Sequence, residues 1–300
     1  MVSYWYAILT MKEQESFSNN SMLMMTTTIP HSDSFIPLSH PRAKSLLIRK
    51  MLVDGHKRGL VVPEGLIAHG RGEAFDYLLG ERTSKIASIA IEAACAALLS
   101  AKYPVISLNG NVAALCAKKI VELSYITEAK IEVNLFYRSQ RREKLIEREL
   151  QRNGAKTILG VGSHASATIP ELQSNRRRVD PNGILKADIV LVALEDGDRT
   201  EALLKMNKKI IAIDLNPLSR TATSANITIV DNVIRAIPEM VAAAKKLKEQ
   251  EQKRRRKQTK NETKIKKIVR DFNNAKNLFE SLSIMRGGNP WKKVKEIVVV

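Results

Sequence analysis

Three short apolar segments follow one another between residues 188 and 232, and each of them ends in a polar cluster. The segments are residues 189–194, 209–213 and 227–230. Continuous runs of Ile, Val, Leu and Ala of this length are typical of strands that are buried on both faces of a parallel sheet. Ligands of such sheets bind at the carboxyl ends of the strands. The sequence therefore predicts a ligand-binding edge made by the polar clusters 195–200, 214–220 and 231–232.

Further strands are predicted upstream, at residues 105–108, 131–137 and 157–162. Helical patterns separate the six strands or flank them, at residues 83–102, 112–125, 143–151, 201–206 and 233–247. Strands that alternate with helices in this way form βαβ units. The chain is therefore predicted to be an α/β protein with a largely parallel sheet flanked by helices.

The chain divides by composition into three parts. Residues 1–38 are rich in Ser, Thr and Met and lack a sustained period, which predicts a flexible extension. The predicted folded domain is 39–245, beginning with a helix that Ser39 caps and Gly59 ends. Residues 246–300 form a basic, helical C-terminal extension, with an amphipathic helix expected at 265–284 that packs back on the domain or joins a partner subunit.

The net charge of +18 is unevenly distributed. Residues 245–267 contain twelve Lys or Arg against three Glu, which is half of the excess. No aromatic residues interleave this segment, so a solvated helix is favoured over a nucleic-acid-binding surface. Cys95 and Cys116 lie in Ala-rich helical patterns without nearby His or Cys partners, which predicts buried, reduced thiols. No segment has the length and apolar character of a membrane span or a signal peptide, and we expect a cytoplasmic protein.

A glycine-rich segment at residues 65–77 surrounds His69 and Arg71 just before an apolar helical pattern. Glycines allow the backbone to approach a phosphate, and a helix N-terminus offers free N–H donors. The segment is predicted to be a phosphate-binding loop; a tight turn with an exposed Arg71 is the alternative. The turn at residues 109–111, between a strand and a helix, is predicted to be a ligand loop or a turn chosen for its backbone geometry.

Two clusters of the predicted edge carry further chemistry. Asp196 and Asp198 precede a helix and could hold Mg²⁺ through water, although acidic residues also simply favour a helix N-terminus. The cluster that starts at Asp214 adds an amide, two hydroxyls and Arg220. Two such loops at adjacent strand ends favour a ligand site over simple turns. The pattern Gly-x-Gly-x-x-Ala at residues 160–165 fits a dinucleotide-binding motif, but Pro170 breaks the helix that should follow.

Six segments resemble the archaeal 4-phosphopantoate–β-alanine ligase family, also called phosphopantothenate synthetases. They are SHPRAKSLLIR (39–49), GLIAHGRGEAFDYLLGE (65–81), NGNVAAL (109–115), NLFYR (134–138), LEDGDRTEAL (194–203) and IDLNPLSRTA (213–222). The resemblance spans residues 39–245 and, more loosely, 265–286. It implies a homodimeric, Rossmann-like enzyme of coenzyme A biosynthesis that joins 4-phosphopantoate to β-alanine. ATP with Mg²⁺ would be the co-substrate, and AMP and diphosphate would be released through an acyl-adenylate.

The resemblance also implies roles for individual residues. Arg49 and Arg71 are assigned to the ATP phosphates. The nucleotide site would be lined by Asp196, Gly197, Asp198, Arg199 and Thr200, with Asp196 or Asp198 near Mg²⁺. The nucleoside would contact Asp214, Leu215 and Asn216. The pantoate phosphate and carboxylate would meet His69, Asn111, Asn134, Arg138 and Arg220; a purely structural role for His69 is the alternative. Catalytic roles are assigned to His69, Arg71, Asn111 and Arg220.

Two other functions stay open at this stage. The first is a nicotinamide-dependent reductase, which is supported only by the motif at residues 160–165. A nucleic-acid-binding protein would use the basic segment 245–267, and this function is disfavoured because no aromatic residues interleave that segment.

Overall fold

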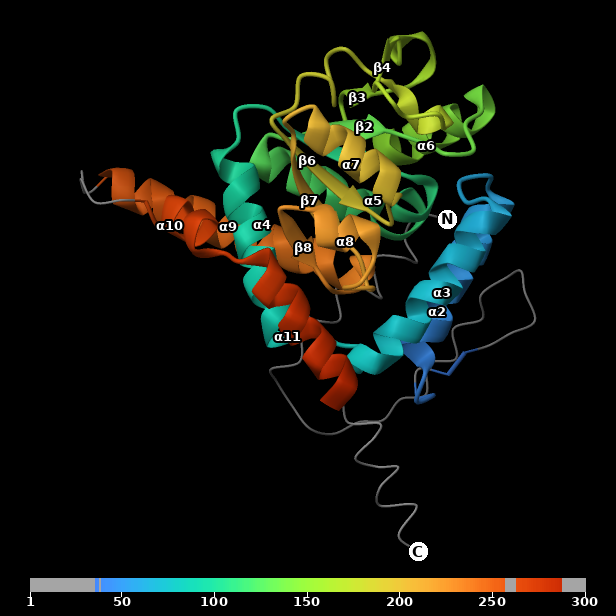
Figure 1. Ribbon diagram of the computed structural model, residues 1–300. Helices are drawn as coiled ribbons and strands as arrows, with labels where there is room; N and C mark the ends of the chain where they lie inside the picture. Colours follow the sequence, from blue (N-terminus) through green and yellow to red (C-terminus); the bar gives the residue numbers. More distant parts are fainter. Residues whose placement is uncertain (1–35, 38, 257–262, 288–300) are drawn as a thin grey trace, which may run out of the picture. The chain divides into compact units, whose positions relative to one another are not determined.

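The computed structural model describes residues 36–37, 39–256 and 263–287. The chain separates into two compact units, Met1–Leu46 and Leu47–Val300. The sheet and every helix from α3 onward belong to the second unit (Figure 1). Nearly all of the predicted extension 1–38 lies outside the described residues. The predicted boundary at 245–246 falls inside a continuous helix, α9 (Val233–Arg256), and the division into three parts stays a prediction.

Six parallel strands form the central sheet, in the order β3-β2-β1-β6-β7-β8. Their bounds are β1 (Pro104–Leu108), β2 (Lys130–Val133), β3 (Ile158–Leu159), β6 (Ile189–Ala193), β7 (Lys209–Ile213) and β8 (Ile227–Ile229). A separate antiparallel pair, β4 (Ala167–Thr168) and β5 (Arg178–Val179), lies between β3 and β6 in the sequence. All six predicted strands are confirmed, and the sheet is parallel throughout.

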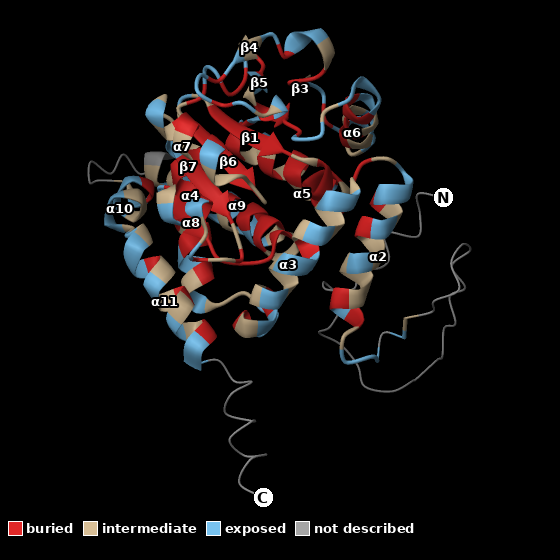
Figure 2. Ribbon diagram, turned by 45° about the vertical axis from the view of Figure 1, so that its right-hand side comes forward, coloured by how far each residue is buried: buried red, intermediate tan, exposed pale blue. Residues whose placement is uncertain are grey.

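Helices cover both faces of the sheet (Figure 1). The described helices are α2 (Ala43–Lys57), α3 (Pro63–Leu79), α4 (Lys85–Ser100), α5 (Gly110–Thr127), α6 (Gln140–Arg152), α7 (Gly197–Lys205), α8 (Arg220–Ser224), α9 (Val233–Arg256), α10 (Lys264–Asp271) and α11 (Asn274–Gly287), of which α4, α5 and α9 cover one face and α7 the other. Side chains alternate along each strand. On β6, Ile189, Leu191 and Ala193 pack on the side of α4, α5 and α9, whereas Val190 and Val192 pack on the side of α7. The central strand β6 is therefore buried on both faces, as Figure 2 shows in red, while the edge strand β3 is only half-buried.

Small residues make close helix packing possible on one side of the sheet. Eight alanines on α4 and α5 are buried, and α4, α5 and α9 pack against one another. Cys95 and Cys116 lie in this layer as free, fully buried thiols, as predicted. The Cys95 thiol contacts the Met240 carbonyl at 3.2 Å, and burial raises the pKa of Cys116 to about 12. Neither thiol is therefore a reactive thiolate.

The prediction of a glycine-rich loop at residues 65–77 is wrong. These residues form the interior of α3, which begins with Pro63 after an extended Val62. Tertiary packing overrides the low helix propensity of the glycines. A Cβ at Gly65 would overlap the side-chain oxygen of Asn111, so this glycine allows α3 to approach α5 closely. No phosphate cradle is formed by this backbone.

The predicted amphipathic helix 265–284 is two helices, α10 and α11, and both pack back on the domain. The break occurs because Asn274 turns to β8, where its Oδ1 accepts a hydrogen bond from Thr228 N at 2.8 Å. Asn277 completes the contact by donating to Thr228 O at 2.8 Å. The predicted helix of the basic segment is confirmed up to Arg256, its residues 248–254 are exposed or partly exposed, and residues 257–262 lie outside the described residues. No helix within the described ranges has the length and apolar character needed to cross a membrane.

Candidate functional site

The predicted ligand loops after β1 and β6 lie side by side at the point where the order of the strands along the sheet reverses direction. The chain leaves β1 through α5 towards β2, and leaves the neighbouring β6 through α7 towards β7. Asn109, which follows β1, donates to Ala193 O at 2.8 Å, and its Oδ1 caps α5 by accepting from Val112 N at 3.1 Å. The loops 109–111 and 194–198 therefore border the same crevice. In open α/β sheets this switch point is where ligands bind.

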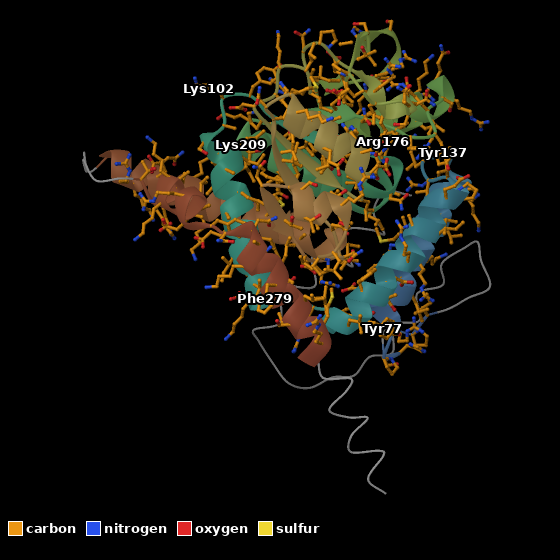
Figure 3. All side chains as sticks on the ribbon, viewed as in Figure 1. Tyr77, Lys102, Tyr137, Arg176, Lys209 and Phe279 are labelled. Carbon is orange, nitrogen blue, oxygen red and sulfur yellow. The ribbon has the colours of Figure 1, made fainter. Side chains whose placement is uncertain are left out.

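The ends of the strands can be followed in Figure 3. Lys102 and Lys209, at the amino ends of β1 and β7, lie on one side of the view, and Arg176 and Tyr137 lie on the other. The predicted site loops that follow strands leave the carboxyl ends of those strands, so they share the edge opposite Lys102 and Lys209, whereas His69 and Arg71 reach the site from α3.

A pocket opens at the carboxyl ends of β6, β7 and β8, against α3 and the start of α9. Its lining is mainly apolar with three polar groups: His69, Gly72, Leu194, Ile213, Leu215, Asp231, Asn232 and Val233. His69 and Leu215 were predicted site residues, and the structure brings them together although they are far apart in the sequence. Small-molecule sites commonly combine such apolar walls with a few polar groups.

His69 is a buried residue of this pocket. Its Nε2 atom makes no hydrogen bond within the described part of the chain and lies 3.8 Å from Glu73 Oε1. Burial lowers the pKa of His69. A neutral imidazole with an unused ring nitrogen is able to bond a ligand. A purely structural histidine would be expected to use Nε2 in a hydrogen bond, and no described residue bonds this atom.

The two arginines predicted for the phosphates differ in their environment. Arg49 is held by Glu73, with Nε at 2.9 Å from both carboxylate oxygens. Arg71 is exposed and makes no hydrogen bond or ion pair among the described residues. It lies close enough to Asp214 to lower the pKa of that carboxyl, which burial raises more strongly. Arg71 is thus on the edge of the pocket and available to a ligand.

The loop after β7 is organised by its own side chains. Asp214 accepts hydrogen bonds from Asn216 N at 2.9 Å and from Ser219 Oγ. Asn216 in turn accepts from Leu218 N at 2.9 Å. Leu215 is the one predicted nucleoside contact of this loop that lines the pocket. Asp214 and Asn216 hold its shape.

The loop after β6 contains a buried charge network. Glu195 accepts hydrogen bonds from both Arg176 and Arg199, and Arg199 also donates to Ser107 at 3.1 Å. Arg199 and Thr200 are completely buried. These two residues, predicted to line a nucleotide site, are instead inside the protein because they anchor the first turn of α7. Only the start of the loop can face a ligand.

The predicted metal residues, Asp196 and Asp198, lie at the start of α7. Burial raises the pKa of Asp196, whose Oδ2 is 3.0 Å from Arg176 Nε, while Asp198 is exposed. No group of three or more His, Cys, Asp or Glu side chains able to hold a metal occurs in the described ranges. One or two carboxylates nevertheless suit Mg²⁺ that arrives with a nucleotide, because phosphates and water complete its shell.

Gly197 and Arg220 meet between α7 and α8. A Cβ at Gly197 would overlap Arg220 Cβ, so only glycine allows this approach. The Arg220 guanidinium is turned outward to Glu201, with Nη2 2.8 Å from Oε2. The predicted catalytic role of Arg220 therefore requires this exposed pair to open, which costs little.

The remaining predicted residues lie beside β1 and β2. Asn111 donates to Gly65 O at 2.8 Å, and Arg138 bonds Glu143 and Gly160 O. Asn134 is fully buried and donates to Arg176 O at 3.1 Å, while its Oδ1 has no hydrogen-bond partner in the described residues. Asn134 therefore has a buried amide oxygen that no described residue satisfies.

Sequence reasoning missed a carboxylate network that closes one side of the pocket. Arg235 on α9 bonds Asp231, which follows β8, at 2.6 Å and Asp76 on α3 at 2.5 Å. Asn232 also donates to Asp76, at 2.9 Å. The spacing of Asp231 and Arg235, four residues apart, was an available signal, but the partner Asp76 is 159 residues from Arg235.

Glu132 is a second missed residue, buried on β2. Its two carboxylate oxygens accept hydrogen bonds from Asp180 N at 3.0 Å and Ile184 N at 2.6 Å. Burial raises the pKa of Glu132 to about 7 against the opposing effect of these donors. The carboxylate fixes the segment that carries Arg176 beside the crevice.

Glu132→Gln is expected to remove a pH dependence of stability. Between the ordinary pKa of 4.5 and about 7, Glu132 holds a proton in the folded protein but not in the unfolded chain. The free energy of unfolding therefore falls as pH rises through this window, by roughly 3 kcal/mol at about 1.36 kcal/mol per pKa unit. Urea denaturation of both proteins from pH 5 to 8 should give a difference in stability that shrinks with pH. A constant difference would contradict the expectation.

The dinucleotide pattern at residues 160–165 does not start a helix. Gly160 and Gly162 have positive φ, and only the 3-10 turn Gly162–His164 follows before β4. The helix that a dinucleotide-binding motif requires is therefore not formed at residues 160–165, as the position of Pro170 predicts. With its strand order and switch point, the protein belongs to the doubly wound, Rossmann-like class of α/β proteins.

Comparison with known proteins gives the family. The model of the phosphopantothenate/pantothenate synthetase family matches residues 86–288. A 4-phosphopantoate–β-alanine ligase of Thermococcus kodakarensis is 48% identical over 252 residues, covering 84% of this chain and 92% of that protein. The ligase of the same name from Methanosarcina mazei is 49% identical over 248 residues, covering 83% and 93%. The chain belongs to the phosphopantothenate synthetase family.

Proposed function

We propose that this protein is an ATP-dependent ligase that joins 4-phosphopantoate to β-alanine and releases AMP and diphosphate. The observation that carries the proposal is the identity of 46–49% with four proteins of that name over most of their length. Those parts of the matched segments that follow strands gather at one edge of the sheet, which supports a common site. A cytoplasmic homodimer is part of the same proposal.

In this proposal the nucleoside lies against the mouth of the small pocket at β6–β8. Leu215 and the other apolar residues of the lining would pack on the base, and the free Nε2 of His69 would bond the nucleotide or the reacting carboxylate. Arg71 would reach the phosphates from the rim. Asp196 and Asp198 would hold Mg²⁺ together with phosphate oxygens and water, and the ion would neutralise charge on the leaving diphosphate.

4-Phosphopantoate would lie across the switch point, beside β1 and β2. A carboxylate oxygen of this substrate attacks the α-phosphorus, and the bond from phosphorus to diphosphate breaks. The β-alanine amine then attacks the acyl carbon, loses a proton, and expels AMP that carries the attacking oxygen. Asn134 Oδ1, buried and without a partner, would accept a hydrogen bond from a substrate hydroxyl. Fixed donors around developing charge are the main source of rate in such transfers.

The test uses 4-phosphopantoate labelled with ¹⁸O in its carboxylate. With ATP, Mg²⁺ and β-alanine, one AMP should form for each product molecule, and mass spectrometry should find one ¹⁸O in the AMP. Formation of ADP and phosphate, or unlabelled AMP, would contradict the adenylate route. AMP formation that does not require 4-phosphopantoate would contradict the ligase proposal itself.

A further inference from the structure

Arg142 is a buried arginine that lacks a carboxylate partner. It lies in the first turn of α6 and is 9% exposed, yet it forms no ion pair among the described residues. Its Nε donates to Leu60 O at 2.9 Å and its Nη1 to Tyr137 O at 2.8 Å. The third nitrogen, Nη2, makes no hydrogen bond with any described residue. A buried charge without an opposite charge is costly, so its retention calls for an anion.

The surroundings of Arg142 increase this cost. The N-terminus of a helix carries partial positive charge, which disfavours a cation in the first turn of α6. Burial lowers the pKa of Arg142 to about 10, and repulsion from Arg176 adds to the effect more than attraction to Glu64 opposes it. Three unfavourable conditions thus coincide at one side chain. Other buried arginines here differ, since Arg138, Arg176 and Arg199 each pair with a glutamate.

The free Nη2 points to the start of α5. A Cβ at Gly110 would overlap both Arg142 Nη2 and Leu60 O, so glycine is required for this approach. Asn109 caps Val112 N, while Gly110 N and Asn111 N, the first two N–H groups of the 18-residue helix, donate to no acceptor among the described residues. A free guanidinium nitrogen therefore lies beside Gly110, the residue that carries the first of two free backbone donors at the carboxyl end of β1. Such an arrangement matches the oxygens of a phosphate.

We infer that Arg142 and the first turn of α5 bind the phosphate group of 4-phosphopantoate and make the enzyme reject unphosphorylated pantoate. This inference rests on the proposed function. Placed at β1, the phosphate would leave the pantoate carboxylate free to reach the nucleotide across the switch point. Tyr137 O, which Arg142 holds, belongs to the segment 134–138 that follows β2, so the same side chain also shapes the substrate loop. Arg142 is then a specificity-determining residue.

The test compares 4-phosphopantoate with pantoate as acyl substrate in wild type, Arg142→Met and Arg142→Lys. For Arg142→Met we expect kcat/KM for 4-phosphopantoate to fall on the order of 100-fold, the size of a lost charge-assisted hydrogen bond. The value for pantoate should change less than about threefold, because that substrate lacks the phosphate. Arg142→Lys keeps the charge and should lose less. An equal loss with both substrates would overturn the inference, since that is the result of a merely structural role.

Binding of inorganic phosphate gives a second readout that does not depend on turnover. Calorimetry or ³¹P NMR should detect phosphate binding to wild type and its loss in Arg142→Met. Arg58→Met is the matched control, because Arg58 contacts the same helix through Glu149 at 2.9 Å but is exposed; it should keep phosphate binding and the preference for 4-phosphopantoate. Equal phosphate binding in wild type and Arg142→Met would overturn the inference. Absence of AMP with both substrates in wild type would instead contradict the proposed function.

Discussion

Replacing Glu195 with glutamine is expected to lower the free energy of unfolding by about 3–5 kcal/mol. The Glu195 carboxylate pairs with Arg176 and Arg199, and the side chains of all three are at least 93% buried. The neutral amide would leave two guanidinium groups inside the protein with insufficient opposite charge. Urea denaturation at pH 7 measures the loss.

A control and a double variant make this prediction specific. Glu171→Gln removes an exposed pair with Lys205, and we expect a change below about 0.5 kcal/mol. Adding Arg199→Met to Glu195→Gln should recover part of the lost stability, because one uncompensated charge disappears. If the double variant is less stable than the single variant, then packing by Arg199 outweighs its charge.

Replacing Arg71 with alanine is expected to lower kcat/KM for ATP by roughly 10²–10³-fold, as for other fixed donors to a developing charge. Arg71 is exposed and unbonded within the described residues, so the free energy of unfolding should change by less than about 0.5 kcal/mol. Steady-state rates of AMP formation measure the kinetic effect, and urea denaturation measures the free energy of unfolding. The combination of a large kinetic effect and an unchanged stability would indicate direct contact with the nucleotide.

Arg82→Ala is the control for Arg71. Arg82 is an exposed arginine just after α3 and also makes no ion pair among the described residues. It differs from Arg71 because it lies beyond the end of the helix and not next to a residue that lines the pocket. It should retain wild-type kinetics. An effect of Arg71→Ala no larger than that of Arg82→Ala would show that Arg71 is an ordinary surface residue without a role in binding ATP.

The strands and their order along the chain could be predicted because local signals specify them. Buried parallel strands are short, mostly apolar runs, and β6 and β7 show this most clearly. The helix α3 could not be predicted because one of its glycines, Gly65, is explained by a neighbour, Asn111 on α5, which no local pattern contains. Sheet order is likewise a long-range property, and only the structure places β1 next to β6.

Prediction of the site was limited by the same cause. Residues at strand ends, such as Leu215, were found because polar clusters mark the ends of apolar runs. The partners of Arg235 and the isolation of Arg142 depend on contacts across 159 and 82 residues. From the sequence, residues 143–151 formed only a charged amphipathic helix, and nothing distinguished the arginine just before it from those on a solvated face. Whether a charge has a partner is a property of the fold.

The contact of Asn274 and Asn277 with Thr228 has a consequence for assembly. The outermost strand of a sheet is normally a template on which another chain can add a strand. Here the backbone N–H and C=O of Thr228, at the centre of β8, are both occupied by side-chain amides of α11. Two copies of the protein therefore cannot join their sheets through β8 without detaching α11. A homodimer that keeps α11 in place must be built from helical surfaces or from the opposite margin at β3, and the same amides protect β8 from aggregation.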